Sequence, residues 1–136
     1  MRVLVDTSVW SLALRKKTVR DDLVIAELSA LIRETRVAII GPIRQEILSG
    51  ISNHAQYNRL RDTLRSFEDS PIETEDYEFA AQLFNHYRNR GIQGSHVDFL
   101  ICAVSVRNNF PIFTLDGDFK HFQKHVEIKL HGPRKF

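Results

Sequence analysis

The stretch from residue 94 to residue 119, GSHVDFLICAVSVRNNFPIFTLDGDF, constrains the fold of this chain more than any other segment. Ser95 is suited to cap a helix whose apolar residues recur at steps of three and four, and the residues at 108–111, NNFP, end it. The short apolar run at 112–115 must then turn back along this helix to pack on it. The helix therefore starts, and the strand ends, at one edge of a sheet, which brings Asp98 and Asp116 together there.

The rest of the chain repeats this alternation of short apolar runs with amphipathic helical segments. Apolar runs occupy residues 3–5 and 37–40. Helices are expected after a cap at Thr7 or Ser8, over 23–34, from 41 to 49, from a cap at Asn53 to 67 and from a cap at Thr74 to 87. A short strand near Ile72, a helical turn at 119–124 and an edge strand at 126–130 complete the expectation. The alternation predicts an α/β fold in which helices cover both faces of a parallel sheet, and the length suits one domain, residues 1–136.

Composition excludes several classes of protein. Hydrophobic residues make up 43% of the chain and charged residues 26%, and no apolar run reaches the roughly 18 residues of a membrane span. The N-terminus does not resemble a signal peptide, so we expect a cytoplasmic protein that has no contact with a membrane. The lone cysteine, Cys102, lies in an apolar helical pattern and is expected to pack in the core. A net charge of +2 permits a nucleic-acid partner where the cations cluster.

Four acids are predicted to converge at one edge of the sheet. Asp6 ends the first apolar run and Asp116 ends a later one, while Glu46 and Asp98 lie near the starts of helices that begin at this edge. Each acid also has a purely structural explanation: Asp98 is spaced from Ser95 as in a capping box, and the residues from Asp116 onward suit a turn. Their joint placement is what favours a functional site.

Crowded carboxylates repel one another, and a bound cation relieves that repulsion. Carboxylate oxygens without clustered His or Cys suit Mg²⁺ or Mn²⁺, and such sites activate water against phosphodiesters. His121 and His125 are four residues apart but belong to no HExxH pattern, which argues against zinc. The sequence therefore predicts a metal-dependent phosphodiesterase site.

Four segments in this order, VLVDTSVW, GPIRQEILSG, HVDFLICA and TLDGDF, resemble the signature of the PIN-domain ribonucleases. In length the chain most resembles the toxins of VapBC toxin-antitoxin systems. The resemblance implies a PIN-like α/β/α sandwich with a central parallel sheet of four or five strands. It also implies a Mg²⁺-dependent endoribonuclease, with Mn²⁺ as a substitute, that cleaves single-stranded RNA such as a tRNA loop. A homodimer and a cognate antitoxin whose C-terminal segment lies in the acidic groove are further implications.

The acids can be matched to the family one by one. Asp6, Glu46 and Asp98 match its acidic triad, Asp116 matches its fourth acid, and Asp118 matches a less regular fifth. The resemblance thus makes the first four both the catalytic residues and the metal ligands. We assign Asp6 and Asp98 as the principal ligands, while Glu46 and Asp116 complete the site through water molecules.

The resemblance also suggests supporting residues, and the charge of RNA suggests substrate-binding residues. Ser8 matches a polar residue that orients the first acid, although the family often has Asn there, and Thr114 matches a hydroxyl that precedes the fourth acid. RNA must also be held against carboxylates that repel it, which requires nearby cations. The strongest candidate is Arg44, two residues before Glu46, and the others are Arg15, Lys16, Lys17, Arg20, Arg88 and Arg90.

Other functions stay open. A noncatalytic PIN-like module that binds RNA or protein would use the same fold, and a housekeeping RNA-processing nuclease would use the same site. A phosphate-handling domain, such as a receiver or an aspartyl-nucleophile phosphatase, fits poorly, because the phosphatase motif needs a second Asp where this chain has Ser8.

Overall fold

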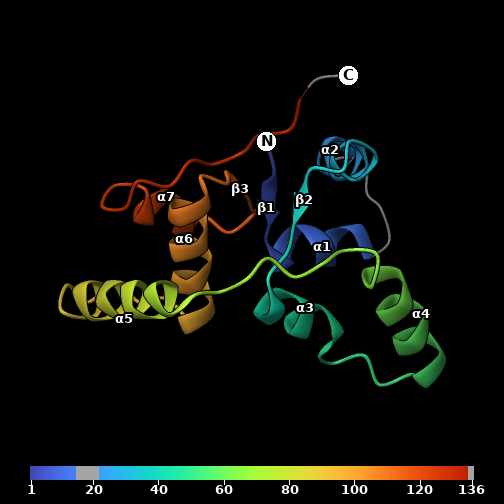
Figure 1. The fold of residues 1–136 in the computed structure, drawn as a ribbon, viewed down its shortest axis with the longest axis horizontal. Coiled ribbons are helices and arrows are strands. Elements are labelled where there is room, and N and C mark those ends of the chain that lie inside the picture. Colours follow the sequence, from blue (N-terminus) through green and yellow to red (C-terminus); the bar gives the residue numbers. More distant parts are fainter. Residues whose placement is uncertain (15–21, 135–136) are drawn as a thin grey trace.

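The computed structural model describes residues 1–14 and 22–134 (Figure 1). Its parallel sheet contains β1 (Val3–Val5), β2 (Val37–Ala38) and β3 (Ile112–Phe113), in the order β2-β1-β3. Val3 pairs with Val37, and Val5 pairs with Phe113. All the strand residues are buried, which fits a sheet that is covered on both faces. The predicted α/β fold with a parallel sheet flanked by helices is therefore confirmed.

Within the described residues, the sheet has three strands where the resemblance implied four or five. The outer positions are occupied by single parallel bridges, between Ile39 and Asp69 beyond β2 and between Ile112 and Leu130 beyond β3. The strands expected at 126–130 and near Ile72 are therefore not formed as such. Each of these segments contributes one bridging residue and then leaves the sheet, so no ladder of hydrogen bonds develops.

Seven helices occupy the described residues. They are α1 (Thr7–Leu14), α2 (Asp22–Arg33), α3 (Gly41–Leu48), α4 (His54–Leu64), α5 (Thr74–Arg88), α6 (His96–Asn108) and α7 (Asp118–Phe122). Figure 1 shows α5, α6 and α7 on one side of the strands and α2 and α4 on the other, with α1 and α3 near the end where β1 and β2 finish. None of these described helices is long and apolar enough to cross a membrane.

Three helix starts differ from the sequence predictions. Glu73, and not Thr74, caps α5, because Glu73 exchanges reciprocal hydrogen bonds with Asp76 three residues later. Helix α7 begins at Asp118, one residue before the predicted turn, with Gly117 in the capping position. Helix α1 already includes Thr7 and Ser8, whose hydroxyls bond to acids elsewhere in the molecule.

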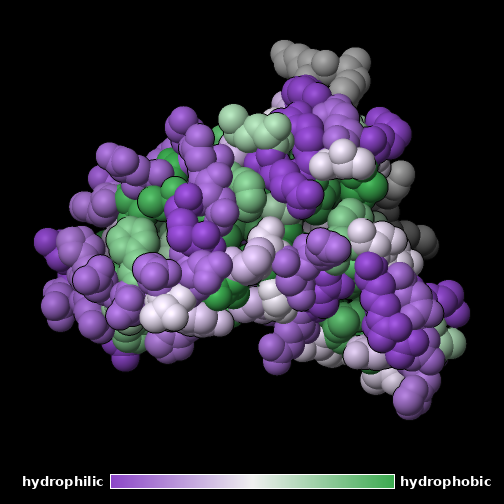
Figure 2. Space-filling view, viewed as in Figure 1, coloured by the Kyte–Doolittle hydropathy of each residue, from purple (hydrophilic) through white to green (hydrophobic). Residues whose placement is uncertain are grey.

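An aromatic cluster beneath α5 fixes the start of α6. Tyr87 stacks on Phe99 with 5.6 Å between ring centroids, and the Tyr87 hydroxyl donates to the Phe122 carbonyl at 3.2 Å. The loop before α6 passes so close to this cluster that a Cβ at Gly94 would lie 2.6 Å from the Phe99 ring. Glycine at this position therefore lets the loop bring Ser95 to the end of the sheet, where it caps α6. On the surface, hydrophobic side chains gather between α5 and α7, whereas α4 is mostly hydrophilic in this view (Figure 2).

Candidate active site

Asp6 is held rigidly at the end of β1. Its side chain is buried, with 7% of the residue exposed. Ser8 Oγ and Thr114 Oγ1 each donate a hydrogen bond to Asp6 Oδ2, both at 2.8 Å. Ser8 belongs to α1 and Thr114 follows β3, so these two bonds join the ends of adjacent strands and fix the orientation of the carboxylate.

The segment after β3 holds these two hydroxyls in turn. The Leu115 N–H donates to Ser8 Oγ and the Asp116 N–H donates to Thr114 Oγ1, each at 3.0 Å. Because each hydroxyl accepts a backbone N–H, its own proton is directed toward Asp6. The structure thus brings both supporting residues named by the resemblance to the first acid.

Asp98 caps its own helix and also faces the other acids. The Ser95 N–H donates to Asp98 Oδ2 at 3.2 Å and the Asp98 N–H donates to Ser95 Oγ at 3.0 Å, which confirms the capping box. Burial raises the pKa of the Asp98 carboxyl above its ordinary value, the bonds with Ser95 lower it, and the charges of Asp116 and Asp6 raise it further. The topology agrees with this: Asp6 follows β1, Asp116 follows β3, and Asp98 lies in the first turn of α6, the helix that precedes β3.

Asp116 and Asp118 lie together in the turn that leads into α7. The Asp118 N–H donates to Asp116 Oδ1 at 2.9 Å, which is the turn geometry allowed for in the sequence. Asp118 is exposed at the first position of α7, whereas Asp116 is half-buried. Asp116 therefore belongs to the acidic group, and Asp118 stands at its rim.

Glu46 joins the site through a residue that sequence reasoning missed. It lies in the second turn of α3, and Thr7 Oγ1 donates to Glu46 Oε1 at 2.9 Å. In the sequence Thr7 was named only as a candidate helix cap, and its position directly after Asp6 was the one signal for a role at the site. A groove of about 490 Å³ runs past this pair, lined also by Pro42, Gln45, Ser49 and Val97. The groove gives Glu46 access to a ligand at the end of the sheet.

The acidic residues have the donor atoms that a hard divalent cation prefers, but their side chains are not arranged around a common point. Among residues 1–14 and 22–134, no three His, Cys, Asp or Glu side chains are arranged to hold a metal ion as they stand. Mg²⁺, however, keeps several waters and is commonly bound through one or two carboxylates plus substrate phosphates. The donors at this end are carboxylate oxygens. Burial raises the pKa of Asp98 most and the charges of Asp116 and Asp6 raise it further, and a cation would relieve that repulsion. The residues therefore fit Mg²⁺ or Mn²⁺.

Among the predicted RNA-binding cations, the strongest candidate has its side chain hydrogen-bonded within the protein. Arg44 uses its guanidinium internally: Nε donates to Asp69 Oδ1 at 2.9 Å, Nη1 donates to the Leu64 carbonyl at 2.9 Å, and Nη2 donates to the Phe67 carbonyl. This side chain therefore braces the segment after α4, and its role as an RNA contact stays a prediction. Arg15, Lys16, Lys17 and Arg20 lie outside the described residues.

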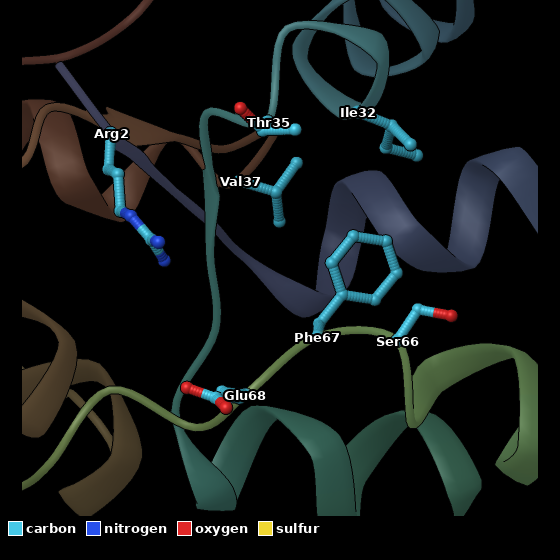
Figure 3. Close-up of a pocket in the computed structure, with 7 residues that line it drawn as sticks. All are labelled: Arg2, Ile32, Thr35, Val37, Ser66, Phe67 and Glu68. Atoms are coloured by element: carbon cyan, nitrogen blue, oxygen red, sulfur yellow. The ribbon is translucent and has the colours of Figure 1, made fainter.

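A cavity of about 450 Å³ lies at the opposite edge of the sheet from the acids (Figure 3). Arg2 precedes β1 and Val37 starts β2, and both line this cavity together with Phe67. The acids instead follow the carboxyl ends of the strands. This cavity is consequently separate from the candidate active site.

Comparisons with known proteins agree with this architecture. The sequence matches the family model of the PIN domain over residues 3–125, a range that contains all five acids. A search of curated protein sequences finds no significant match.

Several solved structures share the fold. FitAcB from Neisseria gonorrhoeae is 22% identical with a TM-score of 0.75, and the match covers 96% of this chain and 97% of that chain. VapBC2 from Rickettsia felis, bound to a DNA fragment from its promoter, is 18% identical with a TM-score of 0.75 over 96% and 98%. VapBC-1 from nontypeable Haemophilus influenzae is 14% identical with a TM-score of 0.73 over 96% and 97%. At these identities the likeness shows a common fold.

Proposed function

This chain belongs to the PIN-domain family, and from that premise we propose that it is a metal-dependent endoribonuclease that cleaves single-stranded segments of RNA. PIN domains are generally nucleases, so hydrolysis of phosphodiester bonds is the expected reaction class. The proposal is supported by the sheet topology, in which Asp6 and Asp116 follow the carboxyl ends of adjacent parallel strands and Asp98 lies in the first turn of the helix before β3. It is also supported by Thr114, whose hydroxyl donates to Asp6 and accepts from the Asp116 N–H.

In the proposed mechanism, Asp6 and Asp98 would hold a Mg²⁺ or Mn²⁺ ion, and Glu46 and Asp116 would complete the site. When bound, such an ion supplies an acidified water and charge stabilisation for phosphodiester hydrolysis. Ser8 and Thr114 keep the Asp6 carboxylate in one orientation through their bonds to Oδ2. A rigid ligand set of this kind lowers the cost of assembling the reactive arrangement.

Glu46 is our candidate for the general base. Thr7 fixes its Oε1 atom, so we assign Oε2 to accept the proton from the attacking water. Glu46 is exposed and borders the groove of about 490 Å³, which gives it access to solvent and to a bound strand. Its position at the side of the acidic group is suited to proton transfer more than to primary metal binding.

We further propose that the chain is the toxin of a toxin-antitoxin pair. Structures of the same fold include VapBC2 and VapBC-1, and a VapBC member from Mycobacterium tuberculosis is described as belonging to a family of toxin-antitoxin systems. By this proposal a small antitoxin covers the acidic groove, the toxin is a cytoplasmic homodimer, and the substrate is a structured RNA such as tRNA with an exposed single-stranded loop.

Cleavage of a single-stranded RNA by the purified protein, with Mg²⁺ and with EDTA, tests the proposed function. We expect Mg²⁺-dependent cleavage that falls about 100-fold or more in Asp6→Asn and Asp98→Asn, with both variants still folded. Glu127→Gln, which changes an exposed acid after α7, is the matched control and should cleave normally. Full activity of Asp98→Asn would refute the proposal.

The alternative is a noncatalytic PIN-like module that binds RNA or protein. It is favoured by the lack, within the described part of the chain, of three acidic or His and Cys side chains arranged around an ion. RNA binding without cleavage at any Mg²⁺ or Mn²⁺ concentration would support this alternative. Sequencing RNA ends from cells that express the chain separates a toxin, which cuts few sites and arrests growth, from a housekeeping nuclease.

A further inference from the structure

A cavity of about 570 Å³ lies between α5 and α6 and has no part in the chemistry described so far. Tyr77, Phe84 and Asn85 line it from α5, and His96 and Leu100 line it from α6. Its volume is within the range of small-ligand sites. Tyr77 is 55% exposed, which is unusual for so large an aromatic side chain beside an apolar floor.

We propose that this cavity binds one unstacked base of the single-stranded RNA whose phosphodiester lies at the acids. The inference rests on the proposed ribonuclease function and adds to it a base-binding subsite.

The first argument is the aromatic platform at the cavity. The His96 ring stacks on Phe84 with 4.6 Å between centroids and 16° between planes, and Phe84 meets the core residue Phe99 edge to face at 6.2 Å. Phe84 is therefore anchored to the core, while His96 is exposed at the outer end of the stack. Sequence-tolerant binding of single strands uses such side chains, because every base has a face on which a ring can stack.

The second argument is position. Three consecutive residues in the first turn of α6 face three neighbouring features: His96 lines this cavity, Val97 lines the groove beside Glu46, and Asp98 faces the other acids. His96 and Asp98 point to different sides of the helix, because residues two apart do not share a face, and Val97 lies between them. A strand with a base in the cavity consequently reaches the acidic group by crossing the start of α6 past Val97.

The third argument is charge. The acids repel phosphate, and Arg44 is occupied internally, so binding needs contacts that do not depend on cations next to the acids. Stacking supplies such contacts. The Arg88 guanidinium lies 5.2 Å from the centroid of the Phe84 ring and can meet a phosphate at a distance from the acids. The Asn85 amide offers both a donor and an acceptor to a base edge.

Two short oligoribonucleotides test the subsite, one carrying 2-aminopurine near its centre and one abasic at that position. Binding is measured in EDTA by fluorescence anisotropy. We expect Tyr77→Ala and His96→Ala to weaken binding of the 2-aminopurine probe about tenfold, the range that stacking provides, with little effect on the abasic probe. Quenching of 2-aminopurine by the wild type should be lost in both variants.

Control variants distinguish the loss of a stacking ring from disruption of the fold. His96→Phe and Tyr77→Phe keep a ring and should bind as the wild type does. Leu23→Ala removes a leucine on α2 that is as exposed as Tyr77, at 55%, and should also change nothing. Light scattering reports whether Tyr77→Ala changes the oligomeric state.

Each outcome decides the inference. The subsite would be overturned if the variants lost affinity equally for both probes, if they lost none for either, or if the oligomeric state changed and binding did not depend on the base. In each of these cases Mg²⁺-dependent cleavage by the wild type would still support the proposed function. A wild type that neither binds nor cleaves either RNA would overturn both.

Discussion

Replacing Glu27 with Gln should destabilise the protein by about 3 kcal/mol at neutral pH. Glu27 is fully buried on α2 and joins the C-terminal segment: Arg134 Nη2 lies 2.7 Å from its Oε1, and His131 Nε2 lies 3.2 Å from its Oε2. Burial alone would raise the pKa of Glu27, but the hydrogen bonds and charge of Arg134 and the bond from His131 lower it from 4.5 to about 2. This lowering of the pKa corresponds to about 3 kcal/mol.

The pH dependence gives this prediction its sign. Because the folded pKa is below the unfolded one, the unfolded chain binds more protons between pH 4.5 and about 2. The contribution of Glu27 is therefore fully present above pH 4.5 and is lost as the pH falls to about 2. In Glu27→Gln this contribution is missing at every pH, so the difference from the wild type should shrink toward low pH.

Urea unfolding of the wild type and Glu27→Gln at a series of pH values from 7 to about 2.5 measures both effects. Glu78→Gln, at an exposed position on α5, is the matched control and should unfold as the wild type does. The reasoning fails if Glu27→Gln is as stable as the wild type at pH 7, or if both proteins lose the same free energy of unfolding on acidification.

Three further predictions concern single side chains. Gly94→Ala should lower the free energy of unfolding by about 1–3 kcal/mol in thermal melts, because its Cβ would lie 2.6 Å from the Phe99 ring; wild-type stability would contradict this. Burial raises the pKa of the Cys102 thiol to about 12, so thiol reagents at pH 8 should label it only after unfolding, and rapid native labelling would count against its place in the core. Thr7→Val should slow RNA cleavage about tenfold at unchanged melting temperature, because it frees Glu46 Oε1, and an unchanged rate would exclude Thr7 as a positioning residue.

Most of the fold follows from sequence periodicity. The structure differs from the prediction where the hydrogen-bond partner of a backbone group determines where a helix starts or whether a strand forms. Asn53 and Ser95 cap their helices as predicted, since capping depends on residues three or four positions apart. The choice between Glu73 and Thr74 for α5 depended on which of two adjacent polar residues bonds to Asp76. An edge segment forms a strand or a single bridge, as at Leu130, according to how long it runs beside the neighbouring strand. The local sequence pattern does not determine that length.

In the candidate site, too, some features follow from the sequence and others depend on long-range packing. Topology alone predicted that Asp98 and Asp116 would meet, because parallel strands and the helices between them share one edge. The internal hydrogen bonds of Arg44 could not be predicted from its position two residues before Glu46. The partner Asp69 is 25 residues away. The bond from Thr7 to Glu46 likewise depends on the packing of α1 against α3, which sequence spacing does not reveal.

The central claim is that carboxylates from distant segments hold one divalent ion at the carboxyl end of the sheet. Calorimetric titration of Mn²⁺ into the purified wild type, Asp6→Asn, Asp98→Asn and the Glu127→Gln control measures this directly. We predict saturable binding to the wild type and the control, and its loss in both aspartate variants. Binding to Asp98→Asn with wild-type affinity and stoichiometry would contradict the claim.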